Sequence, residues 1–224
     1  MNDTTVKTRP AAAGQTFRGV LSPALTPFTK DLEPDRPAFV GFCNWLLEQG
    51  ANGLAVFGTT SEANSLSQRE RMSLLEHLVE KGIPAAKLMP GTGAANLPDA
   101  VELTRHALEL GAGGVLVLPP FYYKNMPEDG IYAYYAGVID RVARTDLKLY
   151  LYHIPQMSGV AITPALIPRL RQQYGGIIAG LKDSSGVWDN VAMLLKEFPE
   201  LAIFPASEKF LLAALKLGAA GCIS

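Results

Sequence analysis

Lys182 is the residue of this sequence whose type and surroundings most clearly suggest chemistry. It ends a short apolar run bounded by glycines, Gly176-Ile-Ile-Ala-Gly-Leu-Lys-Asp-Ser-Ser-Gly186, a pattern typical of a buried strand. Taking an ammonium out of water favours the neutral amine, and a neutral amine can attack a carbonyl carbon. The alternative is a lysine whose aliphatic stem reaches from the strand end to solvent. This stretch alone leaves both interpretations open.

Other polar segments also follow apolar runs at their carboxyl ends. They are Gly58-Thr-Thr-Ser-Glu62, Phe121-Tyr-Tyr123, Tyr152-His153 and Ser207-Glu208. A glycine lets a ligand approach the backbone, and consecutive amides near a helix start favour a carboxylate. Threonine hydroxyls and a tyrosine can orient or pass a proton. Together with an amine, these groups would suit a 2-keto acid, whose carboxylate and carbonyl must both be held.

Each of these segments also has a purely structural interpretation. The glycine-threonine segment can be a loop with a helix cap, and adjacent tyrosines can be packing or surface residues. Tyr152 can fill a barrel interior, and His153 can be a hydrogen-bonded structural histidine. What favours function is that all of them follow different strands at the same end, where (β/α)8 barrels carry their sites.

The elements that must position these residues alternate along the chain. Helix-length amphipathic segments separate most of eight short apolar runs: Gly19–Leu25, Gly53–Phe57, Lys87–Pro90, Gly113–Leu118, Lys148–Tyr152, Ile177–Leu181, Leu201–Phe204 and Ala219–Ile223. Ser67-Gln-Arg-Glu70 is a capping box that predicts a helix start. Such alternation predicts an α/β fold with a parallel sheet, and eight strands favour a (β/α)8 TIM barrel. A doubly wound sheet is the alternative, but its glycine fingerprint is missing after the first strand.

The domain boundaries follow from these runs. We expect a flexible tail over residues 1–18 and one barrel domain over residues 19–224. Because the sequence stops at Ser224, at the end of the eighth run, we expect this barrel to lack its final helix and any C-terminal helical domain.

Composition favours a soluble, cytoplasmic protein with a single core. With 20 basic and 21 acidic residues and a net charge of -1, nothing indicates nucleic acid or an anionic membrane as a partner. No apolar run approaches the roughly 20 residues of a membrane span, and the first 19 residues lack the apolar core of a secretory signal. Cys43 and Cys222 lie in apolar contexts, which predicts buried thiols rather than a disulfide or metal pair.

At this point the sequence resembles a known family, the pyruvate-dependent class I aldolases that include dihydrodipicolinate synthase and N-acetylneuraminate lyase. The resemblance runs from about Arg18 to Ser224 and is carried by three motifs: Gly58-Thr-Thr-Ser-Glu62, Tyr152-His-Ile-Pro-Gln-Met-Ser-Gly159 and Gly180-Leu-Lys-Asp-Ser-Ser185. It implies a TIM barrel, no metal or other cofactor, and a homo-oligomer, either a dimer or a tetramer.

The resemblance also implies roles for individual residues. Lys182 would form a Schiff base with pyruvate or another 2-keto acid, and Tyr152 would shuttle the proton with help from Thr60. Thr59 and Thr60, after Gly58, would bind the keto acid's carboxylate, largely through backbone amides. Tyr122 matches a tyrosine that in tetrameric members reaches into the neighbouring subunit's site, and Tyr123 is an alternative for that role.

Three positions depart from the family pattern. Ser61 stands where glycine is usual, which narrows backbone freedom and could add a hydroxyl near the carboxylate loop. Met157 stands where dihydrodipicolinate synthases typically place an arginine for the second substrate's carboxylate, and methionine has no donor. Losing such a charge-assisted bond, worth about 1.5–3 kcal/mol, would weaken that activity. Glu208 is near a position where sialic acid lyases hold sugar hydroxyls, but Lys209 replaces a second expected acid.

We therefore predict a lyase that reversibly joins or cleaves pyruvate and an aldehyde, acting on a 2-keto-3-deoxy sugar acid smaller than sialic acid. Dihydrodipicolinate synthesis, from pyruvate and aspartate semialdehyde, is the alternative within the class. A non-catalytic relative is the alternative outside it.

Overall fold

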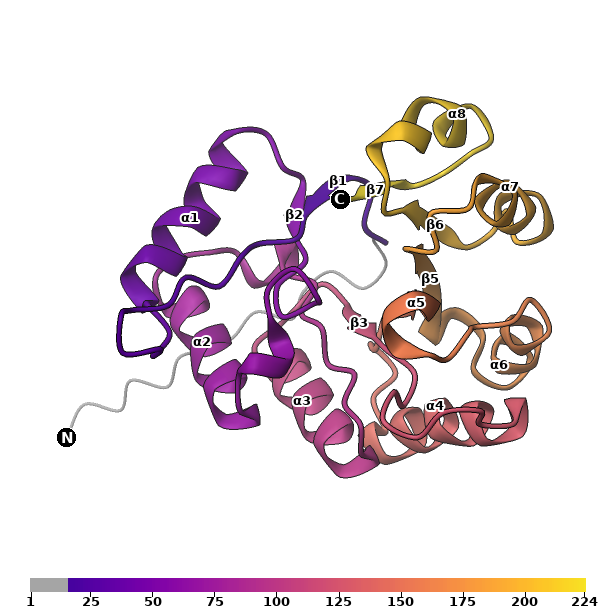
Figure 1. Ribbon diagram of the computed structural model, residues 1–224, viewed down its shortest axis with the longest axis horizontal. Coiled ribbons are helices and arrows are strands. Elements are labelled where there is room, and N and C mark those ends of the chain that lie inside the picture. The colour runs from indigo at the N-terminus through magenta and orange to yellow at the C-terminus, as the bar shows by residue number, and fades with distance from the viewer. Residues whose placement is uncertain (1–15) are drawn as a thin grey trace.

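The computed structural model describes residues 16–224, and within that range strands and helices alternate (Figure 1). The strands are β1 (Gly19–Ser22), β2 (Gly53–Leu54), β3 (Val115–Val117), β4 (Leu149–His153), β5 (Ile178–Asp183), β6 (Ala202–Pro205) and β7 (Gly221–Ile223). The helices are α1 (Arg36–Glu48), α2 (Gln68–Glu80), α3 (Leu97–Glu109), α4 (Glu128–Val142), α5 (Pro155–Ser158), α6 (Leu166–Tyr174), α7 (Trp188–Glu197) and α8 (Leu211–Lys216).

All strand pairs within the sheets are parallel. One sheet has the order β2-β1-β7, and the other has the order β3-β4-β5-β6. Parallel strands that are paired need a crossover connection between them, and the helices that separate the strands along the chain supply it. The predicted parallel α/β organisation is confirmed.

Backbone hydrogen bonds also connect the two sheets to each other. On one side, Met89 N–H donates to the carbonyl of Leu54 at 2.8 Å, and Leu116 N–H donates to the carbonyl of Pro90 at 2.9 Å. On the other side, Ala220 N–H donates to the carbonyl of Ile203 at 3.0 Å. The eight runs thus follow one another round a ring, the arrangement of a (β/α)8 barrel.

The third predicted strand, Lys87–Pro90, is the one that differs from expectation. Its residues pair only through isolated parallel bridges, Leu54 with Leu88 and Gly91 with Leu116. Gly91 lies so close to the preceding loop that a Cβ there would stand 2.2 Å from the carbonyl oxygen of Phe57. The segment therefore connects the sheets without forming a regular ladder.

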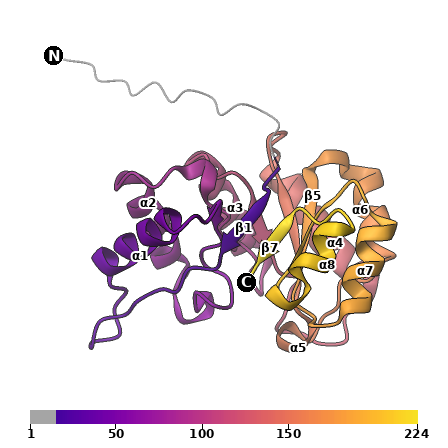
Figure 2. The same cartoon turned by 90° about the horizontal axis from the view of Figure 1, so that it is seen from above.

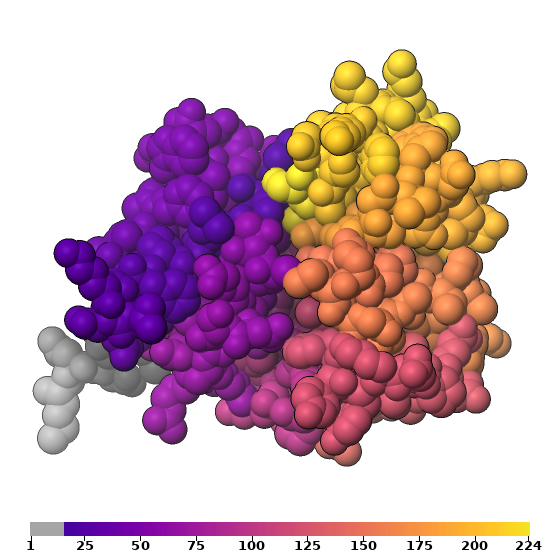
Figure 3. All heavy atoms as spheres, viewed as in Figure 1, coloured from indigo at the N-terminus to yellow at the C-terminus, as the bar shows by residue number. Residues whose placement is uncertain are grey.

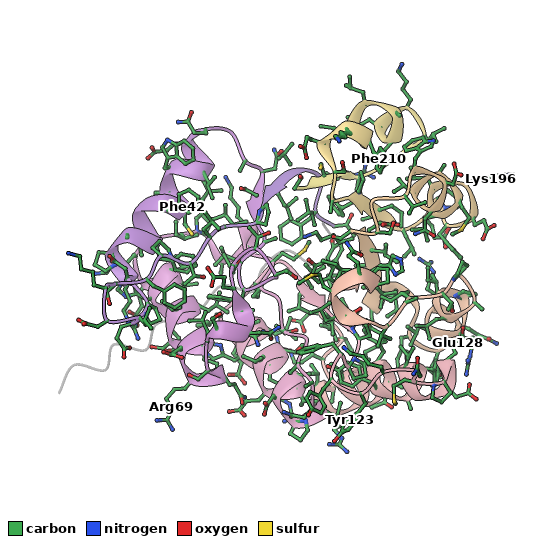
Figure 4. All side chains as sticks on the ribbon, in the orientation of Figure 1. Phe42, Arg69, Tyr123, Glu128, Lys196 and Phe210 are labelled. Carbon is green, nitrogen blue, oxygen red and sulfur yellow. The ribbon has the colours of Figure 1, made fainter. Side chains whose placement is uncertain are left out.

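The helices surround the strands in chain order (Figure 1). Seen from above, α1, α2 and α3 lie on one side of β1 and β7, and α4, α6 and α7 lie on the other (Figure 2). The two halves meet along the middle of the face drawn in Figure 3. Charged residues labelled in Figure 4, namely Arg69, Glu128 and Lys196, point away from the strands, as expected for the outer side of such helices.

The buried side chains form two layers. The larger lies between strands and helices, and the smaller fills the ring interior with residues of alternate strand positions, Leu21, Ala55, Leu116, Tyr150, Tyr152 and Phe204 among them. This alternation follows from the two-residue period of a strand. Cys43 and Cys222 are free and buried, as the sequence predicted.

Two local predictions can be compared with the structure at helix and chain ends. The capping box is confirmed, because the Ser67 hydroxyl accepts from Glu70 N–H while the Glu70 carboxylate accepts from Ser67 N–H. Residues 1–15 of the expected tail lie outside the described residues. Phe17, which we also assigned to the tail, is buried, and its N–H donates to the Tyr150 hydroxyl at 3.0 Å. The packed part of the chain therefore begins before residue 19.

Candidate active site

The centre of the candidate site is a pair of side chains on adjacent strands. Tyr152 of β4 and Lys182 of β5 are direct partners in the parallel ladder. Both are buried, with 3% and 5% of their surface exposed. The structural alternative of a lysine extending to solvent is therefore not what is observed for Lys182.

The two functional groups lie within reach of each other. The Nζ of Lys182 donates to the hydroxyl of Tyr152 at 3.5 Å, and it lies 4.6 Å from the centre of the tyrosine ring. A separation of 3.5 Å is at the long end for a hydrogen bond. Catalytic contacts are often long in the unliganded state and tighten when substrate binds. The arrangement places a candidate nucleophile beside a candidate proton carrier.

The threonine loop after β2 approaches this pair through Thr59. The Thr59 Oγ1 is 3.1 Å from the Tyr152 hydroxyl, and either oxygen can donate. Thr60, to which the family resemblance assigned the role of helping Tyr152, is exposed like Thr59 but makes no hydrogen bond to Tyr152 in the described part of the chain. The space beside Gly58 is open, since a Cβ there would meet no atom within 4 Å. The threonine that contacts Tyr152 is thus Thr59, the first of the two. The sequence motif alone does not distinguish the two threonines.

Asp183 organises the loop that follows Lys182. Its buried carboxylate accepts from the Ser185 N–H at 2.7 Å, from the Ser185 hydroxyl at 2.6 Å, and from the Asn190 side chain. This cluster ties the end of β5 to the start of α7. We did not predict it, although Asp183 followed two residues later by Ser185 is a turn signal that could have found it.

His153 has a structural role, one of the two interpretations left open by the sequence. Its Nδ1 accepts the backbone N–H of Ile162 at 3.1 Å, which assigns the ring proton to Nε2 in the neutral form. Burial lowers the pKa of His153, and the nearby Asp183 carboxylate opposes this only in part. The accepted hydrogen bond acts in the same direction as burial, because it favours the neutral ring.

The remaining predicted residues lie at the rim rather than beside Lys182. Tyr122 is 71% exposed and meets the ring of Tyr123 edge-on at 5.1 Å. Figure 4 shows Tyr123 at the periphery of the molecule. Met157 on α5 is 64% exposed. Glu208 is exposed and accepts from the Ser224 hydroxyl at 2.7 Å, a bond that lowers its pKa.

Surface hollows lie elsewhere on the molecule. One of about 750 Å³ runs along α2 and α3 beside Ser67 and Glu102, and one of about 550 Å³ opens near Phe17 and Lys87. Neither is lined by Lys182, so the site is identified by its side chains rather than by cavity shape.

Among residues 16–224, no group of three His, Cys, Asp or Glu side chains is placed to hold a metal ion. In the same range, no helix has the length and apolar character needed to cross a membrane.

Comparison with known proteins now identifies the family. Residues 16–224 match the dihydrodipicolinate synthetase family. The chain belongs to this family. The family resemblance inferred from the three motifs is therefore confirmed, and with it the TIM-barrel fold class and the broad class of pyruvate-dependent lyases and synthases.

Individual members of the dihydrodipicolinate synthetase family are similar over most of the chain. An uncharacterized DapA-like lyase from Chloroflexus aurantiacus is 41% identical over 92% of this chain and 69% of its own length. The crystal structure of dihydrodipicolinate synthase from Agrobacterium tumefaciens is 35% identical with a TM-score of 0.88, covering 92% of this chain and 72% of that one. YagE, a family member from E. coli K12 solved in complex with pyruvate, is 28% identical with a TM-score of 0.84, covering 94% and 70%.

Proposed function

We propose that this protein is a Schiff-base lyase that reversibly cleaves a 2-keto-3-deoxy sugar acid into pyruvate and an aldehyde. The observation that carries the proposal is the buried amine of Lys182, 3.5 Å from the Tyr152 hydroxyl. An amine beside a proton donor and acceptor is the combination that imine formation needs. The pyruvate complex of the family member YagE supports pyruvate as the common substrate part.

The first half of the reaction forms the covalent intermediate. The Nζ of Lys182 attacks the C2 carbonyl of the keto acid, and the carbonyl oxygen leaves as one water after the Tyr152 hydroxyl gives up a proton, so that a protonated imine remains. This iminium withdraws electrons from the C3–C4 bond, so it acts as the electron sink for cleavage. The buried position of Lys182 beside the Tyr152 ring supports this role, since exclusion of water protects an imine from hydrolysis.

The second half breaks and re-forms bonds at C3. The Tyr152 oxygen, which gave up its proton in the first half, takes the proton from the C4 hydroxyl, with the Thr59 hydroxyl 3.1 Å away in the same proton path. The C3–C4 bond breaks, the aldehyde leaves, and an enamine remains on Lys182. Tyr152 returns this proton to C3 of the enamine, and addition of one water to the resulting iminium releases pyruvate, restores the amine and returns a proton to Tyr152. In the reverse direction the same enamine condenses with the aldehyde.

The threonine loop would hold the carboxylate of the keto acid. We assign this role to the backbone amides of Thr59 and Thr60, next to the open space at Gly58. Thr59 and Thr60 are both exposed, so a ligand can reach this loop. Thr59 then has two roles, its amide toward the carboxylate and its hydroxyl toward Tyr152.

We also propose that the active form is a homo-oligomer in which Tyr122 reaches a neighbouring subunit's site. The support is the exposure of two adjacent aromatic rings, Tyr122 at 71% and Tyr123 at 69%, on a loop at the carboxyl end of β3. Exposed tyrosines of this kind are enriched at protein interfaces. Tyr123 is the alternative residue for this role.

Met157 and its surroundings favour a sugar acid over aspartate semialdehyde. Met157 offers no donor to a second carboxylate. The ammonium of Lys124, which approaches the same helix, already donates to the carbonyls of Phe121 and Ser158. Glu208 is exposed in the turn that follows β6, where it could accept from sugar hydroxyls.

A substrate panel tests the proposal. Pyruvate release from several 2-keto-3-deoxy sugar acids is measured beside condensation of pyruvate with aspartate semialdehyde, with Lys182→Ala as the control. We expect cleavage of at least one sugar acid to exceed the semialdehyde reaction and to vanish in the variant. Preference for the semialdehyde would favour the synthase alternative. Absence of both reactions in the folded protein would favour a non-catalytic relative.

A further inference from the structure

The loop that carries Thr59 is bracketed by two residues in an unfavourable backbone conformation. Phe57 and Glu62 have φ angles of 57° and 54°, in the left-handed region that non-glycine residues rarely adopt. Such residues persist only when surrounding contacts hold them in place. The loop between them, residues 58–61, therefore needs external ties to keep its shape.

Two buried hydroxyls supply such ties. The Ser61 hydroxyl donates to the carbonyl of Ala24, and the Thr26 hydroxyl donates to the carbonyl of Ser61 at 2.8 Å. Ser61 is fully buried, and Thr26 is 4% exposed. Both bonds run between the loop after β2 and the segment after β1. The hydroxyl that Ser61 adds to this loop is thus bonded to the segment after β1.

We propose that Ser61 and Thr26 are positioning residues that fix the threonine loop so that Thr59 meets Tyr152. Neither side chain contacts Tyr152 or Lys182 through a hydrogen bond in the structure. Each acts through the backbone of Ser61, two residues beyond Thr59. A loop held at Ser61 keeps the Thr59 hydroxyl at its 3.1 Å contact and keeps the amides of residues 59 and 60 aimed at one point.

The two hydrogen bonds complement each other because they involve different groups of Ser61. One bond uses the side chain of Ser61 and the other uses its carbonyl. Together they restrain both the position and the rotation of this peptide, which a single bond would leave free to turn. A misplacement of about 1 Å in such a contact can lower a rate by about 100-fold. The inference rests on the proposed function, because Thr59 matters only if Tyr152 transfers protons.

The test uses variants that remove one hydroxyl each. Ser61→Ala and Thr26→Val delete the two donors, while Thr26→Ser retains the donor and is the conservative variant. Thr29→Val is the matched control, because its hydroxyl belongs to the same segment but is exposed and accepts only a 3.3 Å bond from Glu33.

The first measurement is hydrogen–deuterium exchange of the backbone amides of residues 58–62, which needs no substrate. We expect exchange at least about tenfold faster in Ser61→Ala and Thr26→Val, because local opening exposes these amides. Thr26→Ser and Thr29→Val should match the parent. Unchanged exchange in both deletion variants would overturn the proposal.

The second measurement separates positioning from simple loss of stability. At a temperature where all variants are folded, we expect kcat for cleavage to fall about 10- to 100-fold in the two deletion variants, with a higher half-saturating pyruvate concentration for trapping on Lys182. Parental kcat with only a lower melting temperature would overturn the proposal. If the parent itself shows no adduct on Lys182, the proposed function fails, and the exchange measurement still decides whether the ties hold the loop.

Discussion

Tyr152 and Lys182 are cross-strand partners in the ladder between β4 and β5, and their functional groups lie 3.5 Å apart. Neighbouring strands are spaced about 4.8 Å apart, so two inward-facing partners of this length must come into contact. Backbone hydrogen bonding thus sets the distance between the candidate nucleophile and the candidate proton carrier. The sheet rather than a loop therefore sets the geometry of this pair.

Tyr152→Phe should remove proton transfer while preserving the fold. The ring stays in the interior cluster, and only the hydroxyl that contacts Lys182 and Thr59 is lost. We expect kcat for cleavage to fall by about 10²- to 10⁴-fold, the usual contribution of a positioned acid or base. Steady-state kinetics on the purified variant measures this.

Tyr150→Phe is the matched control for that change. Tyr150 lies two residues earlier on the same strand, and its hydroxyl accepts the N–H of Phe17. Its loss should lower the free energy of unfolding by about 1–3 kcal/mol, because a buried donor loses its partner. Its kcat should remain parental. Equal kcat in Tyr152→Phe and the parent would show that Tyr152 carries no proton.

Thr59→Val and Thr60→Val should have unequal effects on cleavage. Both keep the backbone amides, but only Thr59 has a hydroxyl 3.1 Å from Tyr152. We expect kcat to fall by at least about tenfold more in Thr59→Val, since only this change interrupts the proton path. A double-mutant cycle with Tyr152→Phe should show strong coupling for Thr59. A larger loss in Thr60→Val would restore the role first assigned to Thr60.

Local sequence patterns predicted the elements well, because buried strands and capped helices leave short-range signals. The run around Ile178–Asp183 and the capping box at Ser67 are examples. The pairing of residues 88–91 was harder to predict. It depends on the close approach of Gly91 to Phe57 and not on the composition of the segment. Phe17 was assigned to a tail because its partner, Tyr150, is 133 residues away in sequence.

The sequence predicted which residues belong to the candidate site better than it predicted which of them are in contact. Lys182 and Tyr152 stand at strand ends, which sequence patterns locate. The choice between Thr59 and Thr60 depends on the path of a loop with left-handed residues at both ends, and no propensity encodes that path. The roles of Ser61 and Thr26 likewise depend on contacts between distant segments.

Gly180→Ala should destabilise the strand that carries Lys182. A Cβ at this position would stand 2.2 Å from the carbonyl oxygen of Ala202 and 2.7 Å from the Tyr150 ring. We expect a loss of about 1–3 kcal/mol in the free energy of unfolding, typical of overpacking. Gly176→Ala is the control, because a Cβ there meets nothing within 4 Å. Urea unfolding should show the control unchanged or more stable by up to about 1 kcal/mol; equal losses would refute the packing argument.

His153 should make stability depend on pH in the mildly acidic range. Burial lowers its pKa in the folded state below the ordinary value of 6.5. The unfolded chain therefore binds the proton more readily, and the stability contributed by the neutral ring is complete above pH about 6.5. That contribution is lost as pH falls from there through the folded pKa. Urea unfolding at a series of pH values measures the decline.

His153→Asn provides the comparison for this pH dependence. The amide oxygen can accept the N–H of Ile162 in place of Nδ1, and asparagine does not titrate. We expect a shallower decline of stability below pH about 6.5 in this variant. An identical slope in parent and variant would assign the acid sensitivity to other groups.

The most direct measurement of the central claim is reductive trapping of pyruvate on Lys182. The protein is incubated with pyruvate, reduced with borohydride and digested, and the peptides are analysed by mass spectrometry, with Lys182→Met as the control. The account predicts that the peptide containing Lys182 gains the mass of pyruvate, less one water and plus two hydrogens, and that the variant gains nothing. A folded protein that gains no such mass on Lys182, or gains it equally on other lysines, would contradict the account.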